Sequence, residues 1–185
     1  MIRRLASALA LAVPFATGAA AQSLPAKPVA PANVGAEPQS TSATFGDWVL
    51  RCQRQGDGAA APKVCEVALT VQTSQKATIA QIALGRLAKG EALHLTAQLP
   101  VDVSFPSVVK LFAGDKDAHP LELEWRRCAQ IGCFADTILS DEQVQQLRAR
   151  SEPERLEFVE ATGRAVRIPL SFRGLAPALD ALANE

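Results

Sequence analysis

The sequence has no surplus of basic charge, and this absence excludes one class of function. It contains 19 Lys and Arg residues against 19 Asp and Glu residues. Loss of an N-terminal leader that carries Arg3 and Arg4 would leave 17 basic and 19 acidic side chains, a formal charge of −2. Nucleic-acid binding depends on basic side chains that displace counterions from phosphates. We therefore expect no nucleic-acid partner, and the mildly acidic balance also disfavours electrostatic binding to a membrane.

The residue patterns of catalytic and metal sites are also missing. The chain has two histidines, His94 and His119, and neither lies beside Ser or Cys in a motif such as G-x-S-x-G. We interpret both as solvated surface residues. Asp115 and Asp117 are close in the sequence, but the distal ligands of a calcium loop are absent. We therefore expect no catalytic residue, no cofactor and no bound metal.

The N-terminus has the pattern of a secretory signal peptide. Arg3 and Arg4 precede an apolar run over residues 5–16, and small residues follow up to Ala21. The apolar run is shorter than the about 20 residues that span a bilayer, so we expect no transmembrane segment after cleavage. The pattern predicts export, with residues 1–21 removed by cleavage between Ala21 and Gln22.

A proline-rich stretch separates this leader from the rest of the chain. Residues 22–43 contain four prolines among Ala, Ser, Gln and Thr. Such a composition buries too little apolar surface to fold, and proline favours an extended backbone. We predict a disordered Pro/Ala-rich linker over residues 22–43, followed by a single globular domain over residues 44–185.

Four cysteines lie in this domain: Cys52, Cys65, Cys128 and Cys133. An even number of cysteines in an oxidising compartment is typical of disulfides, and four of them allow three connectivities. Pairing of sequence neighbours, Cys52–Cys65 and Cys128–Cys133, is the simplest of the three. Twelve residues separate Cys52 from Cys65, which disfavours a zinc site, and no C-x-x-C redox motif is present.

Alternation of apolar and polar residues predicts seven or eight short strands. This pattern indicates an all-β fold, an antiparallel β-sandwich of jelly-roll or Ig-like general character. Pro169 predicts that the last strand lies at a sheet edge or is bulged. The strands are expected near residues 45–52, 65–71, 78–84, 93–97, 108–112, 121–126, 156–158 and 166–172.

The same alternation assigns individual side chains to the two faces of these strands. Trp48 and Trp125 fall among the apolar positions, which predicts packing in the core and disfavours an exposed aromatic platform for a ligand. Charged side chains fall among the polar positions, where we expect solvated residues, with cross-strand pairs or a partner surface as alternatives. These charged residues are Glu122, Glu124, Arg167 and Arg173.

Two segments depart from the strand pattern and predict short helices. Ser140 and Gln143 form a capping box ahead of a helix near residues 141–150. After Gly174, leucines recur at helical spacing, which predicts a short C-terminal helix.

Three motifs occur in a fixed order along the domain. Residues 45–48 read FGDW, residues 127–135 read RCAQIGCFA, and residues 168–175 read IPLSFRGL. Together they resemble the invasion-associated locus B (IalB) family of exported bacterial proteins, and the resemblance extends over about residues 45–182. It implies a periplasmic or envelope protein, a sandwich-like all-β fold and two local disulfides. It supplies no catalytic residue, and the family's name does not transfer a role in invasion to this chain.

These observations lead to a functional hypothesis. We predict a non-enzymatic envelope protein that binds an unidentified protein or envelope component, in host interaction or in envelope maintenance. Two alternatives from other classes are a periplasmic hydrolase with an unrecognised site and a small-ligand carrier. The expected location is the periplasm, with the outer envelope and release from the cell as alternatives.

The leader gives a direct prediction about the mature chain. Intact-mass measurement of the protein from the periplasmic fraction should show loss of the first 21 residues, because signal peptidase accepts the small side chains that end at Ala21. Recovery of the full-length chain in the membrane fraction would contradict cleavage and would indicate a tethered protein.

Overall fold

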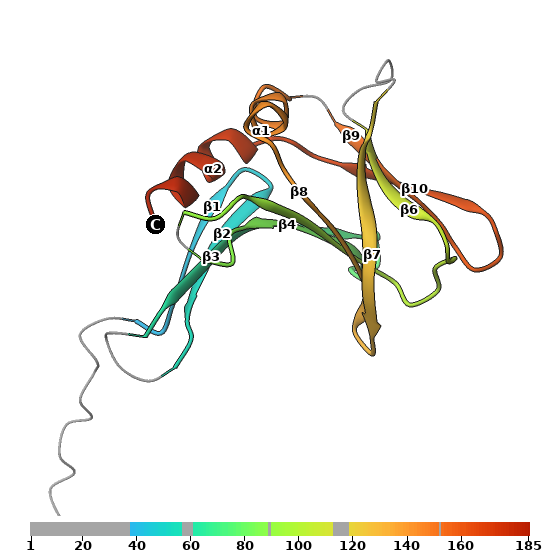
Figure 1. Cartoon of the computed structure of the whole chain (residues 1–185), viewed down its shortest axis with the longest axis horizontal. Coiled ribbons are helices and arrows are strands. Elements are labelled where there is room, and N and C mark those ends of the chain that lie inside the picture. The colour runs from blue at the N-terminus through green and yellow to red at the C-terminus, as the bar shows by residue number, and fades with distance from the viewer. Residues whose placement is uncertain (1–37, 57–60, 89, 113–118, 152) are drawn as a thin grey trace, which may run out of the picture. The chain divides into compact units, whose positions relative to one another are not determined.

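One antiparallel sheet of ten strands forms the framework of the domain (Figure 1). The computed structural model describes residues 38–56, 61–88, 90–112, 119–151 and 153–185. The predicted signal peptide, its cleavage site at Ala21 and Gln22, and the predicted linker up to residue 37 lie outside these ranges.

The strands are hydrogen-bonded in the order β1-β2-β3-β4-β5-β8-β7-β6-β9-β10. Every pair of neighbours is antiparallel. The strands are β1 (Ser40–Phe45), β2 (Trp48–Arg54), β3 (Lys63–Gln72), β4 (Thr78–Gly85), β5 (His94–Leu99), β6 (Val108–Phe112), β7 (Leu121–Ala129), β8 (Gly132–Ile138), β9 (Glu154–Val159) and β10 (Ala165–Leu170).

The all-β antiparallel class and both short helices are confirmed. All ten strands belong to one unclosed sheet, because β5 pairs with β8 and thereby joins the first five strands to the last five. The layers of the expected sandwich are therefore two halves of one strongly curved sheet, and the strands do not divide into two separately paired sheets (Figure 1).

Two strands were missed by the sequence analysis. β8 carries Cys133 and Ala135 on its buried side, and such small side chains give a weak alternation signal. β1 is made of Ser, Thr and Ala up to Phe45 and is held by its register with β2, so nothing in its composition predicts a strand. The linker boundary placed at residue 43 is therefore too late, since β1 begins at Ser40.

The register of the strands aligns apolar side chains in rows that form the core. Val67 of β3 lies opposite Leu84 of β4, which lies opposite Leu95 of β5, and each is 1% exposed or less. Each row removes apolar surface from water, which is the main favourable contribution to folding. Pro169 lies in β10 at the end of the strand order, so the predicted edge position is confirmed.

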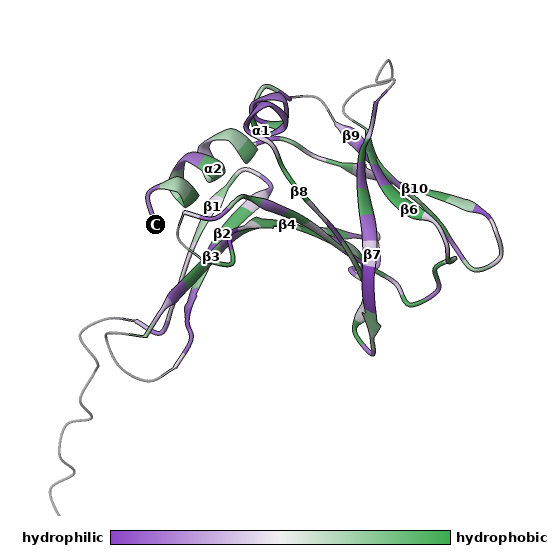
Figure 2. Cartoon of the chain, in the orientation of Figure 1, coloured by the Kyte–Doolittle hydropathy of each residue, from purple (hydrophilic) through white to green (hydrophobic). Residues whose placement is uncertain are grey.

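Two helices complete the domain. α1 (Asp141–Arg148) begins with the predicted capping box, in which Gln143 N–H donates to Ser140 Oγ and Ser140 N–H donates to Gln143 Oε1. α2 (Leu175–Ala183) packs on β1, β2 and β3 and buries Leu175, Leu179 and Leu182. Figure 2 shows the hydrophobic colouring that α2 and the neighbouring strands share.

The two ends of the domain meet through backbone contacts, which we call the terminal clasp (residues 45–48 and 171–174). Asp47 N–H donates to Arg173 O at 3.0 Å. Gly46 and Gly174 have φ of +60° and +93°, the left-handed region that disfavours other residues. A Cβ on Gly46 would lie 2.5 Å from Arg173 O, and a Cβ on Gly174 would collide with the carbonyl group of Phe45. Both glycines are therefore required for this close approach.

We expect Gly174→Ala to destabilise the domain more than Gly163→Ala. Gly163 has a similar φ of +87°, but nothing lies within 4 Å of its added Cβ. The control should therefore cost only the backbone strain of about 1 kcal/mol, whereas the clash at Gly174 should add a further ~1–3 kcal/mol. Urea denaturation of the two variants measures both terms. Equal losses in the free energy of unfolding would show that the close contact at Gly174 does not stabilise the domain.

Candidate functional site

The polar side chains of the terminal clasp form a connected hydrogen-bond network. Asp47 accepts from Arg173 Nε at 3.1 Å, from Arg173 Nη2, and from Ser171 Oγ at 2.6 Å. Arg173 N–H donates in turn to Ser171 Oγ at 3.2 Å. The bonds from Arg173, followed by the bond from Ser171, lower the pKa of the Asp47 carboxyl below its ordinary value of 3.8. This network holds the carboxylate in place on both of its oxygens.

Apolar contacts lie beneath this network. Trp48 is 2% exposed, and its Nε1–H donates to Ser171 O at 3.0 Å. Its ring meets that of Phe172 edge to face, with centroids 6.5 Å apart. The expected burial of Trp48 is thus confirmed. Arg173 was expected to be solvated or paired across strands; its guanidinium is exposed and pairs with Asp47, which lies in the β1–β2 turn.

The other charged residues of the predicted outward stripe form cross-strand pairs. Lys110 Nζ lies 3.6 Å from Glu122 Oε1, and Arg167 Nε donates to Glu157 Oε2 at 3.1 Å. Glu124 pairs with Arg126 of its own strand β7, and Arg126 Nε in turn donates across to Asp136 of β8. Pairs of this kind between exposed side chains contribute little to stability.

The structure places the two histidines on different strands or their approaches. His94 is half-buried on β5, and no hydrogen bond from its side chain to Ser or Cys occurs among the described residues. His119 is exposed ahead of β7. Asp115 and Asp117 lie outside the described ranges, so the structure does not test the prediction that they form no calcium loop.

The cysteines form the local pairs that the sequence analysis favoured. Cys52 and Cys65 face each other across β2 and β3, and Cys128 and Cys133 face each other across β7 and β8. Glu185 has a carboxylate oxygen within 4.8 Å of the sulfur atoms of Cys52 and Cys65. Because the disulfide occupies both thiols, only one ligand group remains, and these residues do not fit a metal ion.

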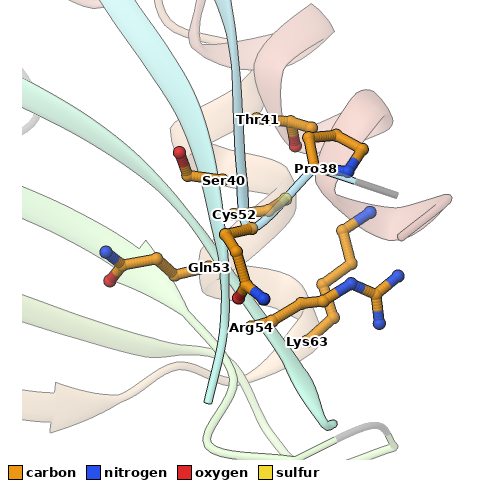
Figure 3. Close-up of a pocket in the computed structure, with 8 residues that line it drawn as sticks. Pro38, Ser40, Thr41, Cys52, Gln53, Arg54 and Lys63 are labelled. Atoms are coloured by element: carbon orange, nitrogen blue, oxygen red, sulfur yellow. The ribbon is translucent and has the colours of Figure 1, made fainter. Parts of the chain in front are cut away.

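Two open hollows with mostly polar linings lie on the described surface. One of about 350 Å³ lies between the β4–β5 connection and the start of α1. The other, about 310 Å³, lies at the start of β1 and is lined by Pro38, Gln39, Ser40, Thr41, Cys52, Gln53, Arg54 and Lys63 (Figure 3). Its lining includes two cationic side chains and no acidic one. Neither hollow has the enclosed apolar character that a carrier of small apolar ligands requires.

Exposed apolar side chains gather at one end of the sheet, which we call the apolar end (Val101, Phe105, Trp125 and Ile131). The exposed fractions of Val101, Phe105 and Ile131 are 61%, 59% and 73%. The half-buried Trp125 packs against Phe105 with ring centroids 5.8 Å apart, and its Nε1–H donates to Ser107 Oγ at 3.3 Å. Trp125 therefore lies at the margin of the core, where one side packs inward and the other meets Phe105.

A hydrogen bond, a disulfide and strand pairing hold the segments of this apolar end together. Leu99 lies opposite Cys133, which brings the β5–β6 loop to the β7–β8 hairpin. Gln98 Nε2 donates to Ile131 O at 2.7 Å, and the Cys128–Cys133 disulfide closes the hairpin. Figure 2 shows hydrophobic colouring at the tip of this hairpin. Sequence analysis missed Phe105 and Ile131 because single apolar residues in turns belong to no periodic pattern.

The fold and its two local disulfides define a class, that of small disulfide-linked antiparallel β proteins with paired N- and C-terminal motifs. The family model of the "Invasion associated locus B (IalB) protein" matches residues 48–183. The chain belongs to the IalB family.

A solved structure supports the same fold. The crystal structure of invasion associated protein b from Bartonella henselae is similar, with a TM-score of 0.67 and 20% sequence identity. The match covers 78% of this chain and 95% of that chain. A comparison with curated protein sequences finds no match. No helix among the described residues is long and apolar enough to cross a membrane.

The lowered pKa of Asp47 predicts a pH dependence of stability. A carboxyl whose folded pKa is depressed stabilises the protein above its unfolded pKa, and this contribution is lost as the pH falls through the folded pKa. Asp47→Asn should therefore lower the melting temperature at pH 7, and the deficit should shrink as the pH falls below 3.8.

Melting curves of both proteins between pH 7 and pH 2 measure this. Glu122→Gln, at an exposed strand position, is the control and should melt close to the parent throughout. A deficit of Asp47→Asn that does not change with pH would mean that the charge of Asp47 contributes nothing to the clasp.

Proposed function

We propose that this IalB-family chain is an exported envelope protein that acts by binding another protein or an envelope component, and not by catalysis. Export is supported by the leader at residues 1–21, which has the charged, apolar and small-residue regions of a signal peptide. It is also supported by the two disulfides, because such bonds persist in oxidising compartments such as the periplasm.

The observation that carries the binding role is the apolar end. Three large apolar side chains are more than half exposed there, and one of them, Phe105, packs against the half-buried Trp125. Exposure of apolar groups to water is unfavourable, and clustered exposure of this kind marks interaction surfaces. Aromatic side chains held by a rigid framework also contribute strongly to binding energy, since little conformational freedom is lost on association. The pairing of β7 with β8 supplies such a framework for Trp125, against which Phe105 packs.

The partner of this end would be a protein or envelope component with an apolar surface. Host interaction is one context, which the name of invasion associated protein b from Bartonella henselae suggests for that protein. Envelope maintenance is the other, and it requires no host. In both, complementarity to the apolar end would determine recognition.

The test compares two exposed apolar sites. Capture of a crosslinked partner from intact cells should fall at least tenfold for the double variant Phe105→Ser with Ile131→Ser. The matched control is Leu87→Ser, because Leu87 is 74% exposed but lies in the β4–β5 connection, at the opposite end of β5. Surface substitutions of this kind should change stability by only about 0.5 kcal/mol. Equal capture by both variants would exclude the apolar end as the binding surface.

A second measurement addresses catalysis. If His94→Ala or His119→Ala removed a measurable hydrolytic turnover while the melting temperature stayed the same, the non-enzymatic proposal would be wrong. The chain would then be a hydrolase whose base is one of these histidines.

A further inference from the structure

The outer edge of β1 presents main-chain groups that no described residue satisfies. Arg54 N–H donates to Gln39 O, which sets the phase of the β1–β2 ladder. Because hydrogen-bonding direction alternates along an antiparallel strand, Ser40, Ser42 and Thr44 must direct their N–H and C=O groups away from β2. β1 is the first strand in the sheet order, and no described strand pairs on that side. The edge is therefore a template for one more strand.

The opposite edge of the sheet is protected against such pairing. Glu160 N–H donates to Arg164 O, which sets the phase of the β9–β10 ladder. The main-chain groups of Arg167 and Pro169 therefore point away from β9, toward the outer edge. Pro169 has no N–H to donate, and Arg167 adds a charge. β1 has neither device, since residues 40–45 contain no proline and no charged side chain. Among the described residues, the β1 edge is therefore open to pairing, whereas the β10 edge is protected.

The cationic hollow adjoins this available edge. The first residues of β1 form part of its wall, together with Arg54 and Lys63 (Figure 3). Lys63 already contacts Glu185, but an ammonium group has three donors and can bind a second carboxylate. A strand added to β1 would place alternate side chains beside the wall of the hollow, where an acidic one would find opposite charge.

We propose that β1 receives an extended segment of another protein as an eleventh strand, and that an acidic side chain of this segment enters the hollow beside Lys63. Main-chain hydrogen bonds supply affinity and the hollow supplies specificity, as in other cases of strand addition. This surface is separate from the apolar end, so either binding site can fail without the other.

Two other occupants fit the edge less well. A second copy of this chain would present β1 itself, which carries no acidic side chain for the hollow. The preceding part of the same chain has proline at positions 25, 28 and 31, and each proline removes one N–H donor from a strand.

The experiment selects peptides from a phage-displayed library of random twelve-residue sequences on the protein that begins at Gln22. Enriched peptides should contain Asp or Glu among alternating strand-forming residues. Their affinity should fall at least tenfold for Ser42→Pro, which removes an outward N–H, and stay within about twofold for Ser42→Ala, which keeps it. The outward N–H of Ser42 lies outside the β1–β2 ladder, so the proline variant should fold.

Further variants keep the test decisive. If Ser42→Pro fails to fold, Ser40→Pro replaces it, because the first residue of an edge strand tolerates proline. Lys63→Glu should abolish the preference for acidic peptides over their amide analogues. The absence of enriched peptides, or peptides that bind Ser42→Pro and Ser42→Ala equally, would overturn the proposal.

Two results would assign the edge to a different occupant. A dimer in solution that Ser42→Pro dissociates would assign it to a second copy. Tighter peptide binding after deletion of residues 22–37 would assign it to the chain's own N-terminal segment. Either result would also overturn the proposal.

Discussion

The contact between Asp47 and Arg173 joins the first hairpin of the sheet to the segment that follows its last strand. A ten-stranded sheet with two free edges has no hydrogen bond of its own that holds those edges in a curved arrangement. The clasp provides this restraint through the two close-packed glycines, the carboxylate–guanidinium pair and the edge-to-face contact of Trp48 with Phe172. The curvature keeps the apolar rows and α2 against one another, so the core depends on contacts at the ends of the domain.

Local patterns account for most of what could be predicted from the sequence. Alternation identified eight of the ten strands, and the capping box identified α1, because these signals come from residues that are neighbours in the chain. β1 and β8 were missed because Ser, Thr, Ala and Cys give weak alternation, and β1 is determined by its pairing with β2. The pairing of β5 with β8, which makes the sheet continuous, is non-local and leaves no periodic trace.

The family motifs have a structural explanation. The FGDW and SFRGL segments, which carried the resemblance, meet in the clasp, although more than 120 residues separate Asp47 from Arg173. The aspartate, the arginine and the glycines there serve backbone approach and charge pairing, so these motifs contribute to the fold. The apolar end and the β1 edge lie outside the clasp. Their side chains can therefore change without loss of the fold.

Closure of the clasp also has a consequence for the order in which the chain acquires its structure. Ribosomes produce residues 171–174 more than 120 residues after their partners at 45–48. Until residues 171–174 emerge, the hairpin of β1 and β2 has no partner segment for the clasp. The non-local β5–β8 pairing is also slow, because a long loop must close first. The domain therefore cannot complete its fold until both halves of the clasp have been synthesised.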